Sequence, residues 1–331
     1  MTDMPDQGLN DVGVVLIGRN EGARLLGCLA SLGDLASRGV YVDSGSTDGS
    51  VEAAKRMGLT VVILPCDRPF TAARARNAGF EELAKSVPNL AFVQFVDGDC
   101  QLASGWVETA RAVMVANPGM AVVCGRRREM FPETSIYNQL CDEEWNTPVG
   151  EAEACGGDCL VRCSAFREVG GYDSELIAGE EPEMCLRMRE RGWKIWRIDA
   201  EMTLHDVDIR HFHQWFKRSV RAGHAYAEIF MLHRRSNKRI WGVNLQRSLV
   251  WGAFIPALAL IGGMIHSGLF LLLLLYPVQI LRLASRTGVT ERTSYKRASL
   301  LVLGKFAEAK GVAHYAAGLV SKQRKAIIEY K

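Results

Sequence analysis

The first hundred residues alternate between short apolar runs and segments whose apolar residues recur at helical spacing. The apolar runs cover residues 14–17, 40–42, 61–64 and 91–96. The segments with helical spacing cover residues 23–32, 50–57 and 72–84. Continuous apolar strands that alternate with helices predict a parallel sheet covered on both faces. Ligands of such sheets bind beyond the carboxyl ends of the strands, so polar residues there are the first candidates for a site.

Polar residues follow three of the four runs, in the segments 18–21 (GRNE), 43–50 (DSGSTDGS) and 97–99 (DGD). Asp97 and Asp99 are separated by one small residue, so their carboxylates can converge on a hard divalent cation such as Mg²⁺ or Mn²⁺. The first run is not followed by G-x-G-x-x-G, and the sequence contains no G-x-x-x-x-G-K-[ST]. These absences argue against a Rossmann-type dinucleotide site and against a P-loop.

The next stretch, residues 121–204, carries its polar residues in glycine-rich segments. These are 156–158 (GGD), 170–173 (GGYD) and 179–183 (GEEPE). We expect a helix over 184–191 that ends at Gly192, because glycine is favoured directly after a helix. A strand is expected over 193–198, and His205 lies just beyond it.

A long apolar segment follows, since the 33 residues 249–281 contain no Asp, Glu, Lys or Arg. His266-Ser267-Gly268 divides it into stretches of 17 and 13 residues. A membrane span needs about 20 residues, with about 17 at the short end, so the second stretch alone falls short. Basic residues on both sides fit a hairpin with both ends in the cytoplasm, or two helices lying in the membrane interface. The alternative is an apolar helical pair buried in a soluble core or a dimer interface.

Charge is distributed unevenly along the 331 residues, although the net charge is only +3. Residues 1–204 carry a net charge of −11, and residues 205–331 carry +14. A basic second part suits a membrane surface, whereas the small total gives no indication of nucleic-acid binding. The nine scattered cysteines suggest reduced thiols in the cytosol, and the first 11 residues lack the basic and apolar regions of a signal peptide.

Five motifs resemble those of family 2 glycosyltransferases with the GT-A fold, in a membrane-associated, bacterial-type form. In chain order they are 17–21 (IGRNE), 42–50 (VDSGSTDGS), 73–79 (ARARNAG), 95–99 (FVDGD), and 170–173 (GGYD) with 179–181 (GEE). The resemblance implies an α/β fold with a mostly parallel sheet and helices on both faces. We expect a flexible N-terminus over 1–11, a glycosyltransferase domain over 12–235, an apolar helical hairpin over 236–298 and a C-terminal amphipathic helix over 299–331.

The resemblance also implies the reaction. A sugar would pass from a nucleotide-sugar donor to a hydroxyl of a carbohydrate or lipid-linked acceptor, with inversion, in polysaccharide or glycolipid assembly. Mg²⁺ or Mn²⁺ would offset the charge of the leaving diphosphate, and a carboxylate would remove the acceptor proton. We expect this reaction at the cytoplasmic face of the cell membrane.

The site residues implied by the resemblance fall into four groups. The donor would be bound by Asn20, Glu21, Asp43, Arg76, Asp97, Lys217 and Arg218. The metal would be held by Asp99, with Asp97 and His205. The acceptor side would include Gly157 and Asp158, whose glycine-rich segment can also be read as a plain tight turn. The catalytic base would be Glu181, with Glu180 or Glu183 as alternatives.

Two other functions are compatible with parts of the sequence. A sugar nucleotidyltransferase also combines a βαβ sheet with metal-binding carboxylates, but its glycine-rich phosphate loop would follow the first strand, where this chain has GRNEG. A non-catalytic membrane-bound scaffold could retain the fold, but the presence of both Asp99 and Glu181 argues against that reading.

Overall fold

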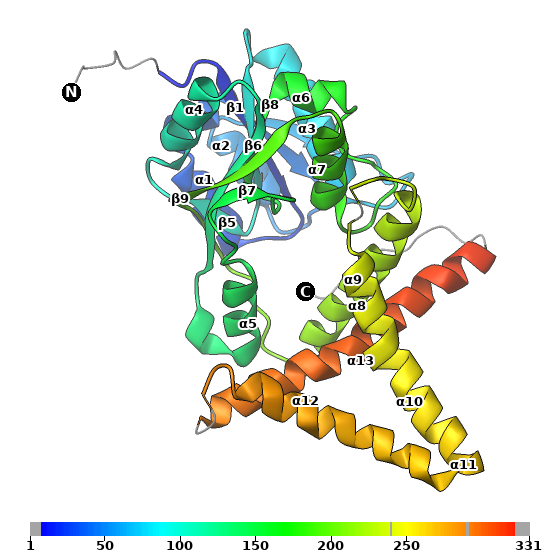
Figure 1. The fold of residues 1–331 in the computed structure, drawn as a ribbon. Helices are drawn as coiled ribbons and strands as arrows, with labels where there is room; N and C mark the ends of the chain where they lie inside the picture. Colours follow the sequence, from blue (N-terminus) through cyan, green and yellow to red (C-terminus); the bar gives the residue numbers. More distant parts are fainter. Residues whose placement is uncertain (1–7, 239, 289–290, 322–331) are drawn as a thin grey trace. The chain divides into compact units, whose positions relative to one another are not determined.

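In the computed structural model the described residues are 8–238, 240–288 and 291–321. They form two compact units (Figure 1). Of the described residues, the first unit contains 8–134 and 141–208, and the second contains 135–140 and those between 209 and 321. The first unit thus ends at Asp208, whereas we expected the glycosyltransferase domain to continue to residue 235. Of the expected flexible N-terminus, residues 1–7 lie outside the described residues, and Asp11 is fixed by an ion pair with Arg111 at 2.6 Å.

The amino-terminal half of the first unit has the alternation that the apolar runs predict. Its strands are β1 (Val12–Gly18), β2 (Gly39–Asp43), β3 (Thr60–Ile63) and β4 (Phe92–Asp97), which pair in parallel in the order β3-β2-β1-β4. The helices between them are α1 (Ala23–Ser31), α2 (Ser50–Arg56) and α3 (Ala72–Ser86). A short 3-10 helix, Gly33–Arg38, leads into β2.

The remaining strands extend this sheet to nine and make it mixed. They are β5 (Cys100–Leu102), β6 (Met120–Glu129), β7 (Gly150–Ala152), β8 (Cys159–Arg162) and β9 (Lys194–His205). β8 runs antiparallel to both β4 and β6, while β6 and β9 are parallel. The associated helices are α4 (Trp106–Ala116), α5 (Ile136–Glu144), α6 (Cys163–Glu168) and α7 (Glu180–Glu190), with a 3-10 turn at Pro132–Thr134. Two elements are longer than expected, because α7 begins at Glu180 instead of residue 184 and β9 reaches His205 instead of residue 198.

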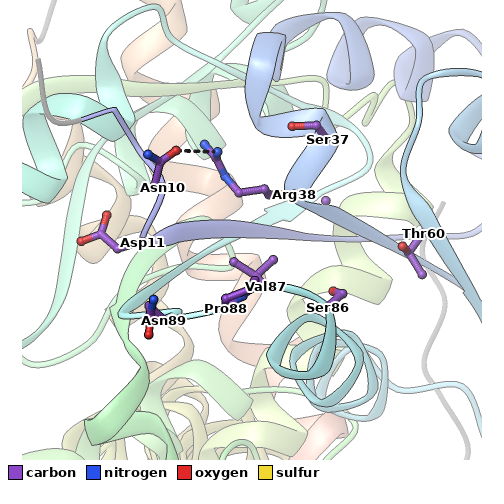
Figure 2. Close-up of a pocket in the computed structure, with 10 residues that line it drawn as sticks. Asn10, Asp11, Ser37, Arg38, Thr60, Ser86, Val87, Pro88 and Asn89 are labelled. Carbon is purple, nitrogen blue, oxygen red and sulfur yellow. Dashed lines mark hydrogen bonds between the residues drawn. The ribbon is translucent and has the colours of Figure 1, made fainter.

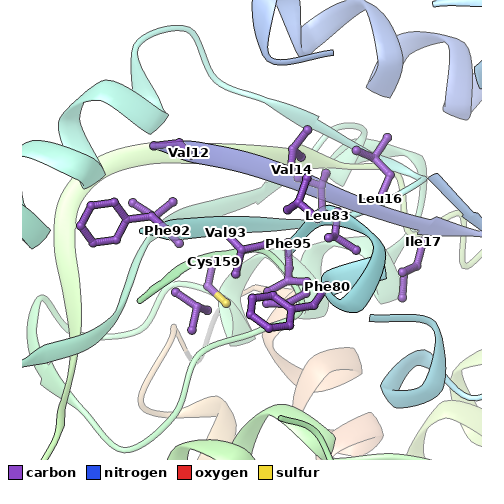
Figure 3. Close-up of a cluster of buried hydrophobic side chains, with 14 of the residues drawn as sticks. Val12, Val14, Leu16, Ile17, Phe80, Leu83, Phe92, Val93, Phe95 and Cys159 are labelled. Atoms are coloured by element: carbon purple, nitrogen blue, oxygen red, sulfur yellow. The ribbon is translucent and has the colours of Figure 1, made fainter. Parts of the chain in front are cut away.

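The core of this unit packs α3 closely against the sheet (Figure 3). Val14 and Leu16 of β1 and Phe95 of β4 are fully buried, as is Leu83 of α3. Gly79 makes the close approach possible, because a Cβ at this position would come within 2.9 Å of a methyl group of Val42. The tight packing holds the first turns of α3 beside the carboxyl ends of the strands.

The second unit contains four long helical segments. α8 (Phe212–Leu232) packs on α13 (Arg292–Ser321) through glycines: a Cβ on Gly223 would collide with the backbone of Glu308. This contact places α8 in the second unit. Between them, α9 (Gly242–Leu249) continues through Val250–Phe254, α10 (Ile255–Ala257), Leu258–Gly262 and α11 (Gly263–Ile265), and the returning helix comprises Ser267–Leu274 and α12 (Leu275–Ala284).

The apolar segment forms a helical hairpin whose turn is at His266. Its two helices, Gly242–Ile265 and Ser267–Ala284, contain 24 and 18 residues and are both long and apolar enough to cross a membrane by length and composition. The second helix exceeds the 13-residue stretch expected from the sequence because it begins at Ser267 and continues to Ala284. Side chains near the turn are open to solvent, with Met264 77% and Ile265 88% exposed, so the hairpin is not the buried core of this chain.

Candidate active site

Strand register gathers the polar segments at one edge of the sheet. Gly18 pairs with Asp43 and Ile17 pairs with Asp97, so β1, β2 and β4 end at the same level. The N–H of Ser44 donates to the carbonyl of Gly18, which ties the loops after β1 and β2 together. The expected convergence of strand-end residues at this edge is therefore present.

The residues predicted to face the nucleotide also stabilise these loops. Asp43 is buried, and its Oδ2 accepts hydrogen bonds from the N–H groups of Gly45 and Ser46, both at 2.9 Å. Asn20 has a φ of 54°, and its N–H donates to Oγ of Ser46 at 2.9 Å. Glu21 forms an ion pair with Arg24 at 2.8 Å. The loops are thus fixed before any ligand arrives, and binding of the base and ribose by Asn20, Glu21 and Asp43 stays a prediction.

The guanidinium of Arg76 connects α3 with the end of β4 and the start of α7. The Arg76 side chain is only 3% exposed. Its Nη2 lies 2.7 Å from Oδ1 of Asp97 at the end of β4. Its Nη1 lies 3.0 Å from Oε1 of Glu180 and 3.0 Å from Oε1 of Glu181 in the first turn of α7. Arg76, which we expected to bind the donor diphosphate, is therefore paired with three carboxylates. These contacts make it a positioning residue for the end of β4 and the first turn of α7.

The acid groups around Arg76 differ in their proton affinity. Burial and the neighbouring Glu180 carboxylate raise the pKa of Glu181 to about 7, even though Arg76 opposes this shift. Burial also acts on Asp97, but the guanidinium groups of Arg76 and Arg127 hold its pKa below the usual value. Near neutral pH this arrangement therefore pairs an ionised Asp97 with a Glu181 that can take up or release a proton.

Asp158 supports Asp97 from the other side and is fully buried. Its Oδ1 accepts the N–H of Asp97 at 3.0 Å, and its Oδ2 accepts the hydroxyl of Thr203 at 2.9 Å. The adjacent Gly157 has no room for a side chain, because a Cβ would lie 2.5 Å from Oδ2 of Asp97 and 2.6 Å from Nη2 of Arg76. Gly157 and Asp158 thus fix Asp97, and their predicted contact with the acceptor stays a prediction.

A group of possible metal ligands lies where β5 pairs with the end of β9. The register sets Cys100 opposite His205, and Nε2 of His205 lies 3.1 Å from Oδ2 of Asp99. Ligand atoms of Asp99, Cys100 and His205 all lie within 4.8 Å of one another, and an overlapping group joins Asp97, Cys100 and Asp158. Burial, followed by the charge of Asp158, raises the pKa of the Cys100 thiol well above its usual value. Carboxylate and imidazole groups are therefore the available donors, and carboxylates suit Mg²⁺ and Mn²⁺.

Two residues of this site were not found from the sequence. Nη2 of Arg127 on β6 lies 3.1 Å from Oδ2 of Asp97, and its Nε lies 3.2 Å from Oδ2 of Asp158. The ring of Trp145 stacks on His205 with centroids 4.7 Å apart and lies 5.0 Å from the guanidinium carbon of Arg127. Three consecutive arginines, 126–128, in a strand-like segment were the available signal for Arg127.

Lys217 and Arg218 lie on α8 in the second unit. Their predicted contact with the donor diphosphate stays a prediction.

A cavity of about 440 Å³ lies at the opposite edge of the sheet, by the amino ends of β1, β2 and β3 (Figure 2). Three of its polar side chains already have partners in the protein: Arg38 donates to Asn10 at 3.2 Å, and Asp11 is paired with Arg111. None of the predicted site residues lines this cavity. Because ligands of parallel sheets bind at the carboxyl ends of the strands, the active site is expected at the Asp97 edge.

Comparison with known proteins defines the class. Residues 14–169 match the model of the family described as "Glycosyl transferase family 2". "Glycosyltransferase AglE" of Haloferax volcanii is 24% identical over 214 residues, covering 62% of this chain and 68% of that protein. "Succinoglycan biosynthesis protein ExoA" of Rhizobium meliloti is 29% identical over 188 residues, covering 53% of this chain and 56% of that protein. The protein is thus a glycosyltransferase.

The fold agrees with this result. The mannosyltransferase PcManGT from Pyrobaculum calidifontis, solved with GDP-Man and Mn²⁺, superimposes with a TM-score of 0.57 at 20% identity, covering 88% of this chain and 87% of that one. The expected GT-A-like fold is confirmed, with a sheet that is parallel in its first half and mixed in its second. The match to the family 2 model covers residues 14–169, a little under half of the chain, and apart from residues 135–140 it lies within the first unit. The chain spans about half to two thirds of the length of the two curated relatives.

Proposed function

We propose that this protein is a membrane-associated, inverting glycosyltransferase that transfers a sugar from a nucleotide-sugar donor to a hydroxyl acceptor in polysaccharide or glycolipid assembly. One observation carries the proposal: Arg76 links Glu181, whose pKa is near 7, to Asp97, which lies two residues from Asp99 and its partner His205. A candidate base and a candidate metal group are thereby held by one side chain.

The donor set of the first unit fits a divalent cation. Asp99 and His205, with Asp97, would hold Mg²⁺ or Mn²⁺, and the ion would offset the negative charge of the leaving diphosphate. PcManGT, which shares the fold, was solved with Mn²⁺. Around this group the protein supplies Arg127 and Asp158, which fix Asp97, and Trp145, which packs on the His205 ring.

Glu181 is the best candidate for the base that removes the acceptor proton. Its side chain is 15% exposed, against 5% for Glu180, so it is the more accessible of the two carboxylates on Arg76. Glu183 is the less favoured alternative, because its side chain is 2% exposed and both of its carboxylate oxygens accept hydrogen bonds from Arg187. A base whose pKa is near the working pH is the most effective, and one base opposite the leaving group gives inversion in a single displacement.

The apolar hairpin supports association with a membrane and an acceptor held there. Its tip is not covered by any of the described residues, and exposed apolar surface of this extent is typical of membrane or protein contact. The basic residues that flank the hairpin favour a cytoplasmic position for both of its ends. The sugar-transfer site would then work at the cytoplasmic membrane face, on a carbohydrate or lipid-linked acceptor.

The proposal is tested by incubating the full chain in neutral detergent with a panel of sugar nucleotides and Mn²⁺ or Mg²⁺. We expect one donor class to release its nucleotide, and we expect chelation of the metal to stop this release. Asp99→Asn should remove both the release and the binding of Mn²⁺, followed by calorimetry, while leaving the helical circular-dichroism spectrum unchanged. Release that is unaffected by chelation, or a variant that retains full activity, would overturn the metal-dependent site.

A second experiment distinguishes a glycosyltransferase from the alternative, a sugar nucleotidyltransferase. With a nucleoside triphosphate and a sugar phosphate as substrates, a nucleotidyltransferase produces pyrophosphate. We expect none from this chain, since the family match favours sugar transfer. Production of pyrophosphate without release from any sugar nucleotide would contradict the assignment.

A further inference from the structure

A cavity of about 400 Å³ lies within the second unit, at the open end of the helical hairpin. Its walls come from both hairpin helices, from the loop after α12 and from α13. Four of the lining side chains are basic, namely Arg247, Arg282, Arg286 and Lys305. No carboxylate lines the cavity among the described residues.

The positive charge of this cavity is largely uncompensated. Lys305 is paired with Glu308, since its Nζ lies 2.8 Å from both carboxylate oxygens. Within the part of the chain that the structure describes, the guanidinium groups of Arg247, Arg282 and Arg286 make no ion pair or side-chain hydrogen bond. Three guanidinium groups around one cavity repel one another, so the arrangement indicates an anionic ligand with several acceptor oxygens.

Apart from the amide of Gln279, the remaining lining residues are apolar or aromatic. Leu283, Leu301 and Val302 form part of the wall, and Leu301 is 50% exposed. Trp251 also lines the cavity, and its carbonyl accepts the hydroxyl of Tyr276 at 2.6 Å. Tryptophan and tyrosine are enriched at the level of lipid headgroups, where one side of the ring is apolar and the other is wet.

The cavity lies at the end of the hairpin away from its turn, next to the exposed apolar helices. Arg247 lies near the start of the first apolar helix, and Arg282 lies near the end of the second. Toward the turn, the returning helix exposes Val278 and Leu281 by 58% and 56%. A ligand with its phosphate among the arginines could therefore lay a hydrocarbon chain along this helix.

We propose that this cavity binds the phosphate headgroup of an anionic membrane lipid, whose acyl chains lie along the exposed apolar side chains of the hairpin. Basic pockets between membrane helices are suited to such headgroups because they combine charge with adjoining apolar surface. A free phosphate would contact the arginines but would make no use of the apolar face. The inference does not rest on the sugar-transfer reaction, and its readout is lipid binding alone.

The test uses the full chain in neutral detergent and native mass spectrometry, which counts bound lipids. The probe is dioctanoyl phosphatidic acid, compared with dioctanoyl phosphatidylcholine and with inorganic phosphate as a competitor. At about 1 kcal/mol for each arginine, Arg282→Gln with Arg286→Gln should weaken phosphatidic acid binding about 30-fold. Arg247→Gln alone, on the other helix, should weaken it about fivefold.

The matched control is Arg292→Gln with Lys296→Gln, which removes the same charge from exposed positions on α13 outside the cavity. This control should bind phosphatidic acid as the unaltered chain does. Equal weakening by the control pair, equal binding of phosphatidylcholine, or unchanged binding by the Arg247→Gln variant would each overturn the proposal. Displacement of the lipid by inorganic phosphate would overturn the lipid assignment in favour of a free-anion site.

Discussion

The backbone N–H of Asp97 donates to Oδ1 of Asp158 at 3.0 Å, so a fully buried carboxylate holds the end of β4 in place. The same carboxylate lies 3.2 Å from Nε of Arg127. Removing it would leave the Asp97 N–H unsatisfied and Arg127 with one anionic partner fewer. Asp158 is therefore expected to contribute to the stability of the first unit as well as to the site.

Asp158→Ala should destabilise the protein by about 3 kcal/mol, because it removes both the hydrogen bond from the Asp97 N–H and the buried ion pair with Arg127. For a unit of this size that corresponds to a fall in melting temperature of about 6–12 °C, measured by thermal unfolding of the detergent-solubilised chain. Asp158→Asn is the matched control, since the amide oxygen can still accept the Asp97 N–H. An equal fall for both variants would mean that the charge, and not the hydrogen bond, supplies the effect.

Glu181→Gln should lower kcat by about 10²–10⁴-fold, because the amide cannot accept the acceptor proton. The KM for the donor should stay within about twofold, since the side chain keeps its size and α7 keeps its first turn. Steady-state nucleotide release measures both constants. Glu180→Gln is the control, and a larger loss of kcat in that variant would transfer the role of base to Glu180.

The pH dependence of kcat/KM should reflect the ionisation of Glu181. The base works only when deprotonated, so activity should rise with pH and level off above the pKa of about 7. Below that pH, each unit should cost about tenfold, because the ionised fraction falls tenfold. A pH series with the detergent-solubilised chain tests this. A flat profile between pH 5.5 and 8, chosen as about 1–1.5 units either side of the expected midpoint, would exclude Glu181 as the titrating base.

Gly157→Ala should displace the Asp97 carboxylate, because the new Cβ would lie 2.5 Å from Oδ2. Since Asp97 belongs to the candidate metal group, Mn²⁺ affinity measured by calorimetry should fall by about 10–100-fold. Gly156→Ala is the neighbouring control, because the nearest atom to its Cβ would be Nη1 of Arg127 at 3.4 Å, an ordinary contact. Equal affinities for the two variants would show that Asp97 tolerates the crowding.

Much of the first unit could be predicted from local sequence. Apolar runs fixed the positions of β1 to β4, and the polar residues that follow them were correctly expected at one sheet edge. The start of α7 was placed four residues too late. Gly179 adopts a φ of 82° and begins the helix at Glu180, and Pro182 is tolerated because it lies in the first turn.

The contacts that complete the site could not be read from the sequence. Arg127 is 30 residues from Asp97 along the chain, and Trp145 is 60 residues from His205. Arg127 and Asp97 meet because β8 alone lies between β4 and β6 in the mixed half of the sheet, and Trp145 contacts His205 from the turn after α5. The grouping of α8 with the second unit likewise depends on a contact between distant parts of the chain, that of Gly223 with α13.

Because the guanidinium of Arg76 is shared by three carboxylates, the stability of the fold depends on the charge at position 76. An uncharged side chain there would leave Glu180 and Glu181 without their shared counter-ion, and it would leave Asp97 with Arg127 alone. Folding could then proceed only if some of these acids bound protons. Such a variant would be more stable in mildly acidic buffer and would lose stability as the pH rises, so Arg76 keeps the fold stable at neutral pH.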